Sequence, residues 1–229
     1  GTIGIMVPLV CAVFDWWKGV LPPLPDKPLL VFVSHRHEDH FNPAVFALAD
    51  CKADIQFLLG SDFHLTPHNL TKWQLSPEIA AKCRRCGKHD TFAPLPGVTV
   101  ETFPSTDEGV AWMVTVNGQS IFHAGDLNWW HWAEEDLAWN RNMEANFKRY
   151  AEPLRGRRVD LAMLPLDSRL KTGGYLGPNY FLNLMEVRRF LPMHQWEDFA
   201  FTDEFLSAYP QFAPITVKIH RDGEFLGEL

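Results

Sequence analysis

Cysteine is scarce in this chain: four occur among 229 residues, too few for the disulfide framework of a small secreted protein. Cys83 and Cys86 form a single Cys-x-x-C pair, whereas a zinc ribbon needs two such pairs. No apolar run reaches the roughly 18–20 residues that cross a bilayer. The apolar start, residues 1–14, also lacks the basic segment and cleavage site of a signal peptide. We therefore expect a cytoplasmic protein with reduced thiols and no membrane span.

Positive charge is in deficit. The chain has 21 Lys and Arg residues against 28 Asp and Glu, which gives a net charge of −7. This balance argues against a polyanion such as nucleic acid as the main partner, although a local basic patch could override it. The expected partner is a small-molecule substrate. The sequence leaves association into a homo-oligomer open.

A dense group of metal-binding side chains stands out near the start of the chain. Its members are His35, His37, Glu38, Asp39 and His40. Imidazole nitrogens and carboxylate oxygens are the donors that zinc and similar divalent ions prefer. The apolar run at residues 29–33 predicts a buried strand before this group, and Asn42 with Pro43 predicts a helix start after it. The group is therefore expected on a loop at the carboxyl end of a strand, where open α/β sheets place their chemistry.

The spacing divides this group in two. His35 and His37 flank a single residue, so an extended loop can direct both toward one ion. Asp39 and His40 follow far enough along the chain to reach a second ion nearby. The pattern His-x-His-x-Asp-His thus predicts two ligands for each of two metals. The alternative is a polar turn that is rich in histidine by chance.

Two further strand ends carry residues of the same chemistry. Residues 119–123 are expected to form the second strand of a hairpin, because Asn117-Gly118 between apolar runs is a strong turn signal. This strand leads into Gly125 and Asp126. Farther along, an apolar strand ends at His194. Three strand ends that each supply a ligand are the pattern expected of a site assembled across a sheet.

With these residues the chain resembles the metallo-β-lactamase superfamily, whose signature is the His-x-His-x-Asp-His motif. The resemblance covers nearly the whole sequence. It implies a single domain over residues 1–229 and an α/β fold, a four-layer αββα sandwich with the metals at the edge between its two sheets. The stretch from His123 to Asp126 and the compact size look closest to the metal-dependent hydrolases allied to ascorbate-6-phosphate lactonase.

The resemblance also implies roles for individual residues. The implied ligands are His35 and His37 for a first ion, Asp39, His40 and His194 for a second, and Asp126 as a bridge between both. Two divalent ions, zinc before manganese or iron, are the implied cofactors. Asp39 and Asp126 are the implied catalytic residues, with Asp39 able to orient the attacking hydroxide. His123 is expected to be a core residue or to lie behind the ligands.

One ligand of the superfamily pattern is missing. Most relatives have a further histidine between the first motif and the Gly-Asp pair, which completes three imidazoles around the first ion. The matching segment here, Phe103–Gly109, has no histidine, and its Asp107 either replaces it or serves as a turn residue. His131 is a second possible replacement. A site with fewer nitrogen donors is expected to bind its metal more weakly, or to hold manganese or iron.

The residues around the ligands suggest a substrate pocket. Trp129 and Trp130 follow Asp126 closely, so their indoles either wall the site or pack in the core. Arg169 lies in residues 165–174, whose double glycine predicts a mobile loop, and its guanidinium could hold a carboxylate or phosphate. We take these two tryptophans and Arg169 as candidate substrate contacts. Asp15, which follows an apolar segment, either lies near the metal loop or caps a turn.

Other patterns predict the surrounding elements. Trp139, Met143, Phe147 and Tyr150 have helical spacing and predict a buried helix face that ends before Pro153. Thr202, followed by two acidic residues, predicts a capped helix start. Residues 3–14 are expected to form one strand. Residues 215–220 and 224–226 are expected to be the last strands.

The function implied by the resemblance is a metal-dependent hydrolase. The expected target is an ester, lactone or phosphoester bond, with a lactone or another cyclic ester, with or without a phosphate group, as the first choice of substrate. Cleavage of a phosphodiester, including RNA, is the alternative within enzymes. The missing histidine motivates an alternative of another class, a non-catalytic metal-binding protein.

Overall fold

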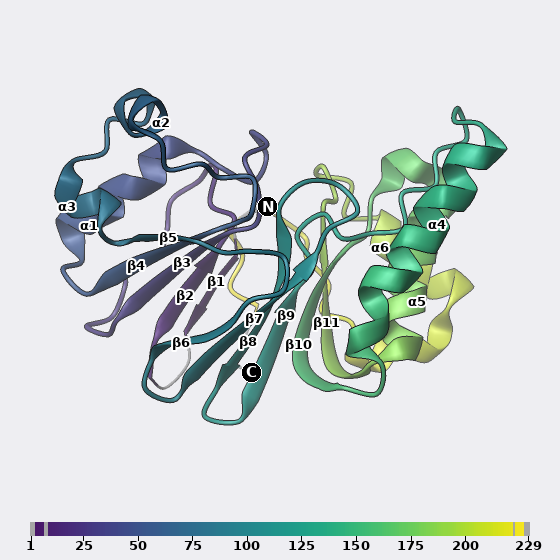
Figure 1. The fold of residues 1–229 in the computed structure, drawn as a ribbon. Coiled ribbons are helices and arrows are strands. Elements are labelled where there is room, and N and C mark those ends of the chain that lie inside the picture. Colours follow the sequence, from purple (N-terminus) through teal and green to yellow (C-terminus); the bar gives the residue numbers. More distant parts are fainter. Residues whose placement is uncertain (1–2, 7–8, 222, 227–229) are drawn as a thin grey trace.

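The computed structural model describes residues 3–6, 9–221 and 223–226. Its first sheet contains, in spatial order, β1 (Ile3–Met6), β2 (Cys11–Phe14), β3 (Leu29–Val33), β4 (Ile55–Leu59) and β5 (Cys83–Arg85). Its second sheet contains β11 (Glu186–Met193), β10 (Arg158–Pro165), β9 (Gln119–His123), β8 (Val110–Val116), β7 (Val98–Pro104) and β6 (Thr91–Leu95). The two sheets face each other in the middle of the molecule (Figure 1).

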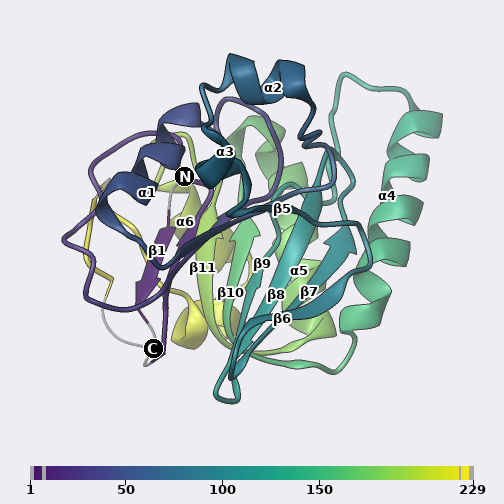
Figure 2. The same cartoon turned by 60° about the vertical axis from the view of Figure 1, so that its left-hand side comes forward.

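Helices cover the two outer faces. Over the first sheet lie the 3₁₀ helix η1 (Pro43–Ala47), α1 (Leu48–Cys51), α2 (Pro67–Lys72) and α3 (Pro77–Ala80). On the side of the second sheet lie α4 (Leu137–Ala151), η2 (Glu152–Leu154), η3 (Ser168–Tyr175), α5 (Leu176–Leu184), α6 (Phe201–Ala208) and η4 (Pro210–Ile215). Figure 2, a view turned by 60°, shows α2 above the strands and α4 along their right-hand side. The chain therefore forms the αββα sandwich that the sequence predicts.

Strand β3 is buried on both faces, which explains its unbroken apolar sequence. Leu29 and Val31 belong to the core beneath α1–α3, whereas Phe32 belongs to the core between the sheets. The Phe32 ring stacks on Phe14 with centroids 4.6 Å apart and meets Trp112 of the second sheet edge-on at 5.3 Å. These aromatic contacts join the two sheets directly behind the loop that carries the histidines.

Parallel strands bring several loops to one edge of the sandwich. In the first sheet β2, β3, β4 and β5 run parallel, and in the second β9, β10 and β11 do so. The predicted hairpin between β8 and β9 is confirmed, with Asn117 and Gly118 both at positive φ. The carboxyl ends of β2, β3, β9, β10 and β11 all lead into residues of the site described below.

The terminal parts of the sequence differ from the prediction. Residues 3–14 form two antiparallel strands rather than one, because Ile3 pairs with Phe14. No strand forms at 215–220 or at 224–226. Ile215 instead ends η4, a helix favoured by Pro210 at its first turn, and only an isolated bridge joins Thr216 to Phe190.

Two local features on the carboxyl-terminal side differ from the prediction. Most of the expected loop forms η3 (Ser168–Tyr175), which Asp167 caps by accepting a hydrogen bond from the Arg169 N–H and which is interrupted at Lys171, at φ +54°. Thr202 does not cap α6 but lies buried within it, where its hydroxyl accepts a hydrogen bond from Gln195. Within the described ranges, none of the helices is both long and apolar enough to cross a membrane.

Candidate metal centre

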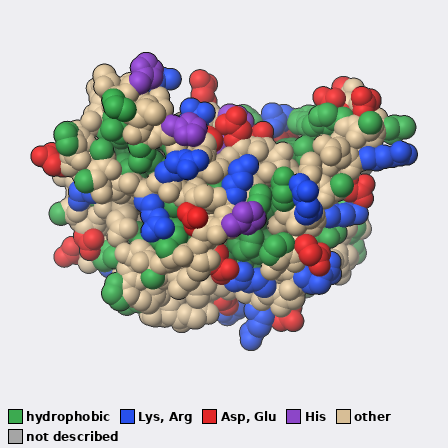
Figure 3. Space-filling view, in the orientation of Figure 1, with side chains coloured by type: hydrophobic (Ala, Val, Ile, Leu, Met, Phe, Trp, Pro, Cys, Tyr) green, Lys and Arg blue, Asp and Glu red, His purple; other side chains and the backbone are tan. Residues whose placement is uncertain are grey.

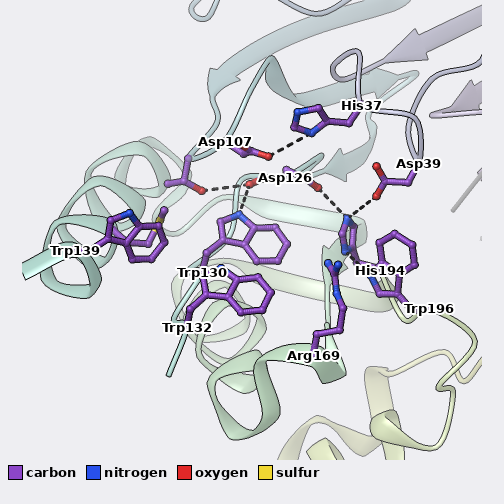
Figure 4. Close-up of a pocket in the computed structure, with 12 residues that line it drawn as sticks. His37, Asp39, Asp107, Asp126, Trp130, Trp132, Trp139, Arg169, His194 and Trp196 are labelled. Atoms are coloured by element: carbon purple, nitrogen blue, oxygen red, sulfur yellow. Dashed lines mark hydrogen bonds and ion pairs between the residues drawn. The ribbon is translucent and has the colours of Figure 1, made fainter. Parts of the chain in front are cut away.

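Side chains with nitrogen and oxygen donors converge at the shared edge in two groups. The first is His35, His37, Asp107 and Asp126, and the second is Asp39, His40 and His194. Within each group the donor atoms lie within 4.8 Å of one another. Figure 4 shows five of these side chains turned toward a common centre. The structure thus brings together every ligand that the resemblance implies and, of the two possible replacements for the missing histidine, Asp107.

Four donor atoms converge around the second group. They are Nε2 of His40, Nε2 of His194, Oδ2 of Asp39 and Oδ1 of Asp126. The His40 nitrogen lies 3.2 Å from the His194 nitrogen, 3.4 Å from Asp39 and 3.2 Å from Asp126. The His194 nitrogen lies 3.3 Å from each of the two oxygens. Donor atoms about 2.0 Å from one tetrahedral ion lie about 3.3 Å from one another, so these five separations match the bond lengths of zinc to nitrogen and oxygen.

The first group is more open. Oδ2 of Asp126 lies 3.4 Å from Nε2 of His35, so the two oxygens of this one carboxylate serve different groups. Nδ1 of His37 lies 3.5 Å from Oδ2 of Asp107, and these side chains are 45% and 43% exposed. His40 and His194, by contrast, are almost fully buried. The first group is therefore the less preorganised of the two.

Asp15, which follows β2, orients two of the histidines. Its Oδ2 accepts a hydrogen bond of 2.7 Å from Nδ1 of His40. The same oxygen accepts a 2.7 Å hydrogen bond from the Ser34 hydroxyl, whose oxygen lies 2.9 Å from Nδ1 of His35. An ionised carboxylate can only accept, so the Nδ1 of His40 and the Ser34 hydroxyl both donate to Asp15. The Ser34 oxygen is then left to accept from the Nδ1 of His35. Both rings therefore carry their proton on Nδ1 and present Nε2 to the centre. Of the two sequence-based roles for Asp15, the structure supports the one beside the metal loop.

Asp167, which follows β10, does the same for His194. Its Oδ2 accepts a hydrogen bond of 3.0 Å from Nδ1 of His194 and one of 3.3 Å from Nε1 of Trp196, and Arg169 donates to both oxygens. Burial raises the pKa of Asp167, but the bonds from His194 and Arg169 lower it to about 2. Sequence reasoning assigned Asp167 no role. The available signal was its position after a parallel strand, like that of Asp126.

The charges of the centre favour a cation. Nε2 of His35 and Oδ1 of Asp126 are buried and make no hydrogen bond to any described residue. Because the Nδ1 atoms of His40 and His194 both donate to carboxylates, their Nε2 atoms face each other across 3.2 Å and need a positive charge nearby. Burial lowers the pKa of His194, whereas the charge of Asp126 raises it, to about 10. A field that attracts a proton so strongly also attracts a divalent ion, so the residues fit a metal.

The backbone around the ligands is tightly constrained. Gly109 has φ +71°, and a Cβ on it would lie 1.9 Å from the Ser34 carbonyl oxygen. Gly125 has φ +53° and would place a Cβ 2.8 Å from that of Ser34. His194 itself adopts φ +61°, an uncommon conformation for a residue with a side chain. Such strain is typical of positions that the surrounding structure fixes for chemistry.

Two of the three candidate substrate contacts lie at the site and one does not. Trp130 and Arg169 line the cavity beside the ligands, and Nε1 of Trp130 donates to the Asp126 carbonyl oxygen over 3.0 Å. Trp129 does not line it; the ring packs on Phe147, and the Lys148 ammonium lies 4.7 Å from the ring centroid. The expected substrate contact of Trp129 is therefore corrected, because consecutive side chains outside a helix seldom share a face.

Two histidines lie outside the ligand groups. His131 belongs to neither group, so Asp107 is the residue that stands where the missing histidine was expected. His123 is buried, stacks on Phe14 with centroids 5.1 Å apart, and accepts a hydrogen bond at Nδ1 from the Gly125 N–H. Its expected place in the core behind the ligands agrees with these contacts.

Comparisons with known proteins show which solved structures share this fold. No protein-family model and no curated protein sequence matches the chain. Among solved structures, the metallo-β-lactamase fold protein YhfI from Bacillus subtilis aligns with a TM-score of 0.55 and 11% identity over 90% of this chain and 85% of that one. The isothiocyanate hydrolase from Delia radicum gut bacteria aligns with a TM-score of 0.56 and 13% identity over 97% and 94%.

Two more structures share the arrangement. Zinc-bound PqqB from Methylobacterium extorquens aligns with a TM-score of 0.53 and 14% identity over 96% of this chain and 84% of that one. A mutant of CmlA β-hydroxylase aligns with a TM-score of 0.58 and 8% identity over 94% of this chain, which spans 50% of that longer protein. At such low identities the likeness concerns the fold. The chain has the metallo-β-lactamase fold.

Proposed function

We propose that the chain is a metal-dependent hydrolase that cleaves an ester, lactone or phosphoester bond with a pair of divalent ions, zinc before manganese or iron. The observation that carries this proposal is the convergence of donor atoms from His40, His194, Asp39 and Asp126, in which each histidine nitrogen lies 3.2–3.4 Å from the other three atoms. These separations match ligands of one zinc ion, and Asp126 extends a second oxygen to the other group.

The proposed division of ligands follows from the two groups. His35, His37 and Asp107 would hold one ion, Asp39, His40 and His194 the other, and Asp126 both. A pair of ions held there would lower the pKa of a water molecule and polarise the bond under attack. Asp15 and Asp167 keep the Nδ1 protons of His40 and His194 away from the centre. The Nε2 atoms of both histidines therefore keep their lone pairs free to bind a metal ion.

Asp39 is the proposed residue for orienting water. Its side chain is 25% exposed and lines the cavity, whereas the side chains of Asp126 and His194 are 7% and 6% exposed. It can therefore reach both a water molecule and a substrate. Burial raises the pKa of Asp39, but hydrogen bonds from His194 and His40 hold it below its usual range. Asp39 is thus ionised near neutral pH and can accept a hydrogen bond from water.

Two solved structures with this fold support the proposal by analogy. One is a hydrolase, the isothiocyanate hydrolase, and another, PqqB, binds zinc. Phosphodiester cleavage in a nucleic acid fits less well, because the net charge is −7 and the face in Figure 3 mixes basic, acidic and apolar side chains without a continuous basic surface. A small-molecule substrate is therefore the proposed partner.

A non-catalytic metal-binding protein is the competing class, and metal content with activity separates it from an enzyme. Protein purified with zinc would be analysed for metal and assayed on simple esters, lactones and a bis-aryl phosphate. We expect about two equivalents of metal and turnover that a chelator abolishes and zinc restores. Two bound ions without turnover on any such bond would favour the non-catalytic class.

A further inference from the structure

The cavity beside the ligands has two chemically different walls. It has a volume of about 380 Å³ and is lined on one side by donors of the two groups, among them Asp39, Asp126 and His194. The rest of the lining is mostly apolar and contains Trp130, Trp132, Trp139, Met143 and Trp196, together with Arg169. Figure 4 shows three of these indoles below and to the left of Asp126 and the fourth beside His194. A small substrate at the ligands would therefore also lie against aromatic rings.

Three of the tryptophans are held in place by contacts with the site itself. Trp130 meets His194 edge-on at 5.5 Å between centroids and is fixed by its hydrogen bond to Asp126. Trp132 lies parallel to Trp130, at an interplanar angle of 8°. Trp196 donates to Asp167 and has the Arg169 guanidinium 4.4 Å from its ring centroid. The wall is therefore preorganised rather than a chance exposure of rings.

The fourth tryptophan, Trp139, shows how far the aromatic wall extends. The helical pattern predicts Trp139 and Met143 in the core with Phe147, but only Phe147 is fully buried. Trp139 is 36% exposed and turns with Met143 into the cavity. A large exposed ring that adjoins a cleft and other apolar groups marks a binding surface more often than an isolated exposed ring does. The first half of α4 therefore extends the aromatic wall beyond the ligands.

Away from the ligands, the cavity offers little to hold a strongly anionic substituent. Arg169 is the one basic residue other than histidine in the described lining, and its guanidinium already bonds both oxygens of Asp167. The lining also includes the carboxylates of Asp39, Asp107 and Asp126. The two proposed ions would offset these carboxylates, so a phosphate substituent away from the ions would find only an arginine that is already paired. A neutral or weakly charged group fits this balance better.

We propose that the site takes carboxylic esters or lactones that carry a flat aromatic ring, with the ring against the tryptophan wall and the carbonyl at the ligands. This assignment rests on the proposed hydrolase function and narrows its substrate class. Hydrolysis breaks the bond between the acyl carbon and the leaving oxygen, water supplies the oxygen of the new acid, and the leaving oxygen takes a proton. The reaction needs no further reactant.

Binding of a product analogue tests the aromatic wall without any turnover. Phenylacetate and cyclohexylacetate share a carboxylate and a similar apolar size but differ in aromaticity. Calorimetric titration of the zinc-loaded protein should give a Kd for phenylacetate at least about threefold lower than for cyclohexylacetate, because stacked aromatic pairs gain more than their buried area. Equal affinities, or tighter binding of the cyclohexyl acid, would overturn the aromatic preference.

Substitutions locate the preference on the wall. Trp139→Ala should weaken phenylacetate binding about threefold or more and reduce the preference over cyclohexylacetate. Leu137→Ala is the matched control, because Leu137 is an apolar residue on the same helix, 73% exposed, and does not line the cavity. Trp132→Ala provides a second variant, and thermal melting checks that each one folds. A preference that survives both tryptophan substitutions unchanged would exclude this wall.

Turnover then distinguishes failure of this inference from failure of the proposed function. We expect kcat/KM for methyl phenylacetate to exceed that for methyl cyclohexylacetate in the native protein, and the ratio to fall in Trp139→Ala. Equal hydrolysis of both esters would contradict the aromatic preference while leaving the hydrolase intact. If the protein binds phenylacetate but hydrolyses no ester, the proposed hydrolase function is wrong, and the substrate assignment that rests on it is wrong too.

Discussion

Nδ1 of His40 lies 2.7 Å from Oδ2 of Asp15, and both groups are buried. The bond joins the ends of two neighbouring parallel strands, β2 and β3, and fixes the ring of a proposed metal ligand. Asp15 also accepts hydrogen bonds from the N–H and hydroxyl of Ser34, so one carboxylate sets the geometry of the histidine loop. The donors of the site therefore depend on residues that would not themselves contact a metal.

Asp15→Asn removes this negative charge while keeping the shape of the side chain. We expect zinc affinity at the tighter site to fall by roughly 10- to 100-fold, the usual effect of losing a carboxylate behind a histidine ligand. Competition with a chromophoric chelator measures this affinity. Asp160→Asn is the control, because Asp160 bonds Ser120 on the second sheet and contacts no proposed ligand. Equal zinc affinities in the two variants would refute the role of Asp15.

The two metals are expected to bind with different affinities. The two histidines of the second group are almost fully buried, whereas His37 and Asp107 of the first are nearly half exposed. Titration with zinc should therefore show one tight and one weaker equivalent. Asp107→Ala should weaken only the binding of the weaker equivalent, which the first group holds. Asp107→His supplies a third imidazole to that group and should strengthen this binding. A single class of sites in the native protein, unaffected by either substitution, would contradict this asymmetry.

Two glycines with similar backbone conformations offer a matched test of packing against the metal loop. Gly109 and Gly118 have φ of +71° and +83°, but only at Gly109 would a Cβ clash, 1.9 Å from the Ser34 carbonyl oxygen. Gly118→Ala should cost about 1 kcal/mol of the free energy of unfolding through backbone strain alone. Gly109→Ala should cost at least about 2 kcal/mol more and should also reduce zinc affinity.

Urea unfolding compares these two glycine variants under one condition. Because the strain is common to both, the difference between them isolates the contact with Ser34. A Gly109→Ala protein as stable as Gly118→Ala would show that the segments around Ser34 are less tightly packed than the structure indicates.

His123 should make stability depend on pH. Burial lowers its pKa to about 4 from the ordinary 6.5. Between these values the unfolded chain binds a proton that the folded protein does not, so the free energy of unfolding rises with pH across this window, by up to about 3 kcal/mol from this group. His123→Asn removes the titration and retains an acceptor for the Gly125 N–H. Urea unfolding in a chelator from pH 4 to 7 should show a smaller rise for the variant, and an unchanged rise would contradict it.

The ligands were predictable from the sequence because each follows an apolar strand. Asp126 and His194 come directly after β9 and β11, and parallel strands align such ends without any knowledge of the complete fold. The hairpin before Asp126 was equally clear from its Asn-Gly turn. The local sequence was therefore enough to predict both the metal-ligating residues and their position at the carboxyl ends of the strands.

Residues whose role depends on tertiary packing were harder to predict. Asp167 matters because its carboxylate meets His194, 27 positions away, and nothing local distinguishes it from a helix cap. Trp129 and Trp130 look alike in the sequence, yet one packs on α4 and the other lines the cavity. A helical apolar stripe likewise cannot show that Trp139 faces a cavity while Phe147 faces the core.

Anomalous X-ray diffraction from crystals grown with zinc tests the central claim most directly. We predict two zinc peaks on either side of Asp126, one about 2.0 Å from the donors of Asp39, His40 and His194, and a weaker one beside His35, His37 and Asp107. A structure with no peak between His40 and His194, at a zinc concentration that occupies other sites, would contradict the account.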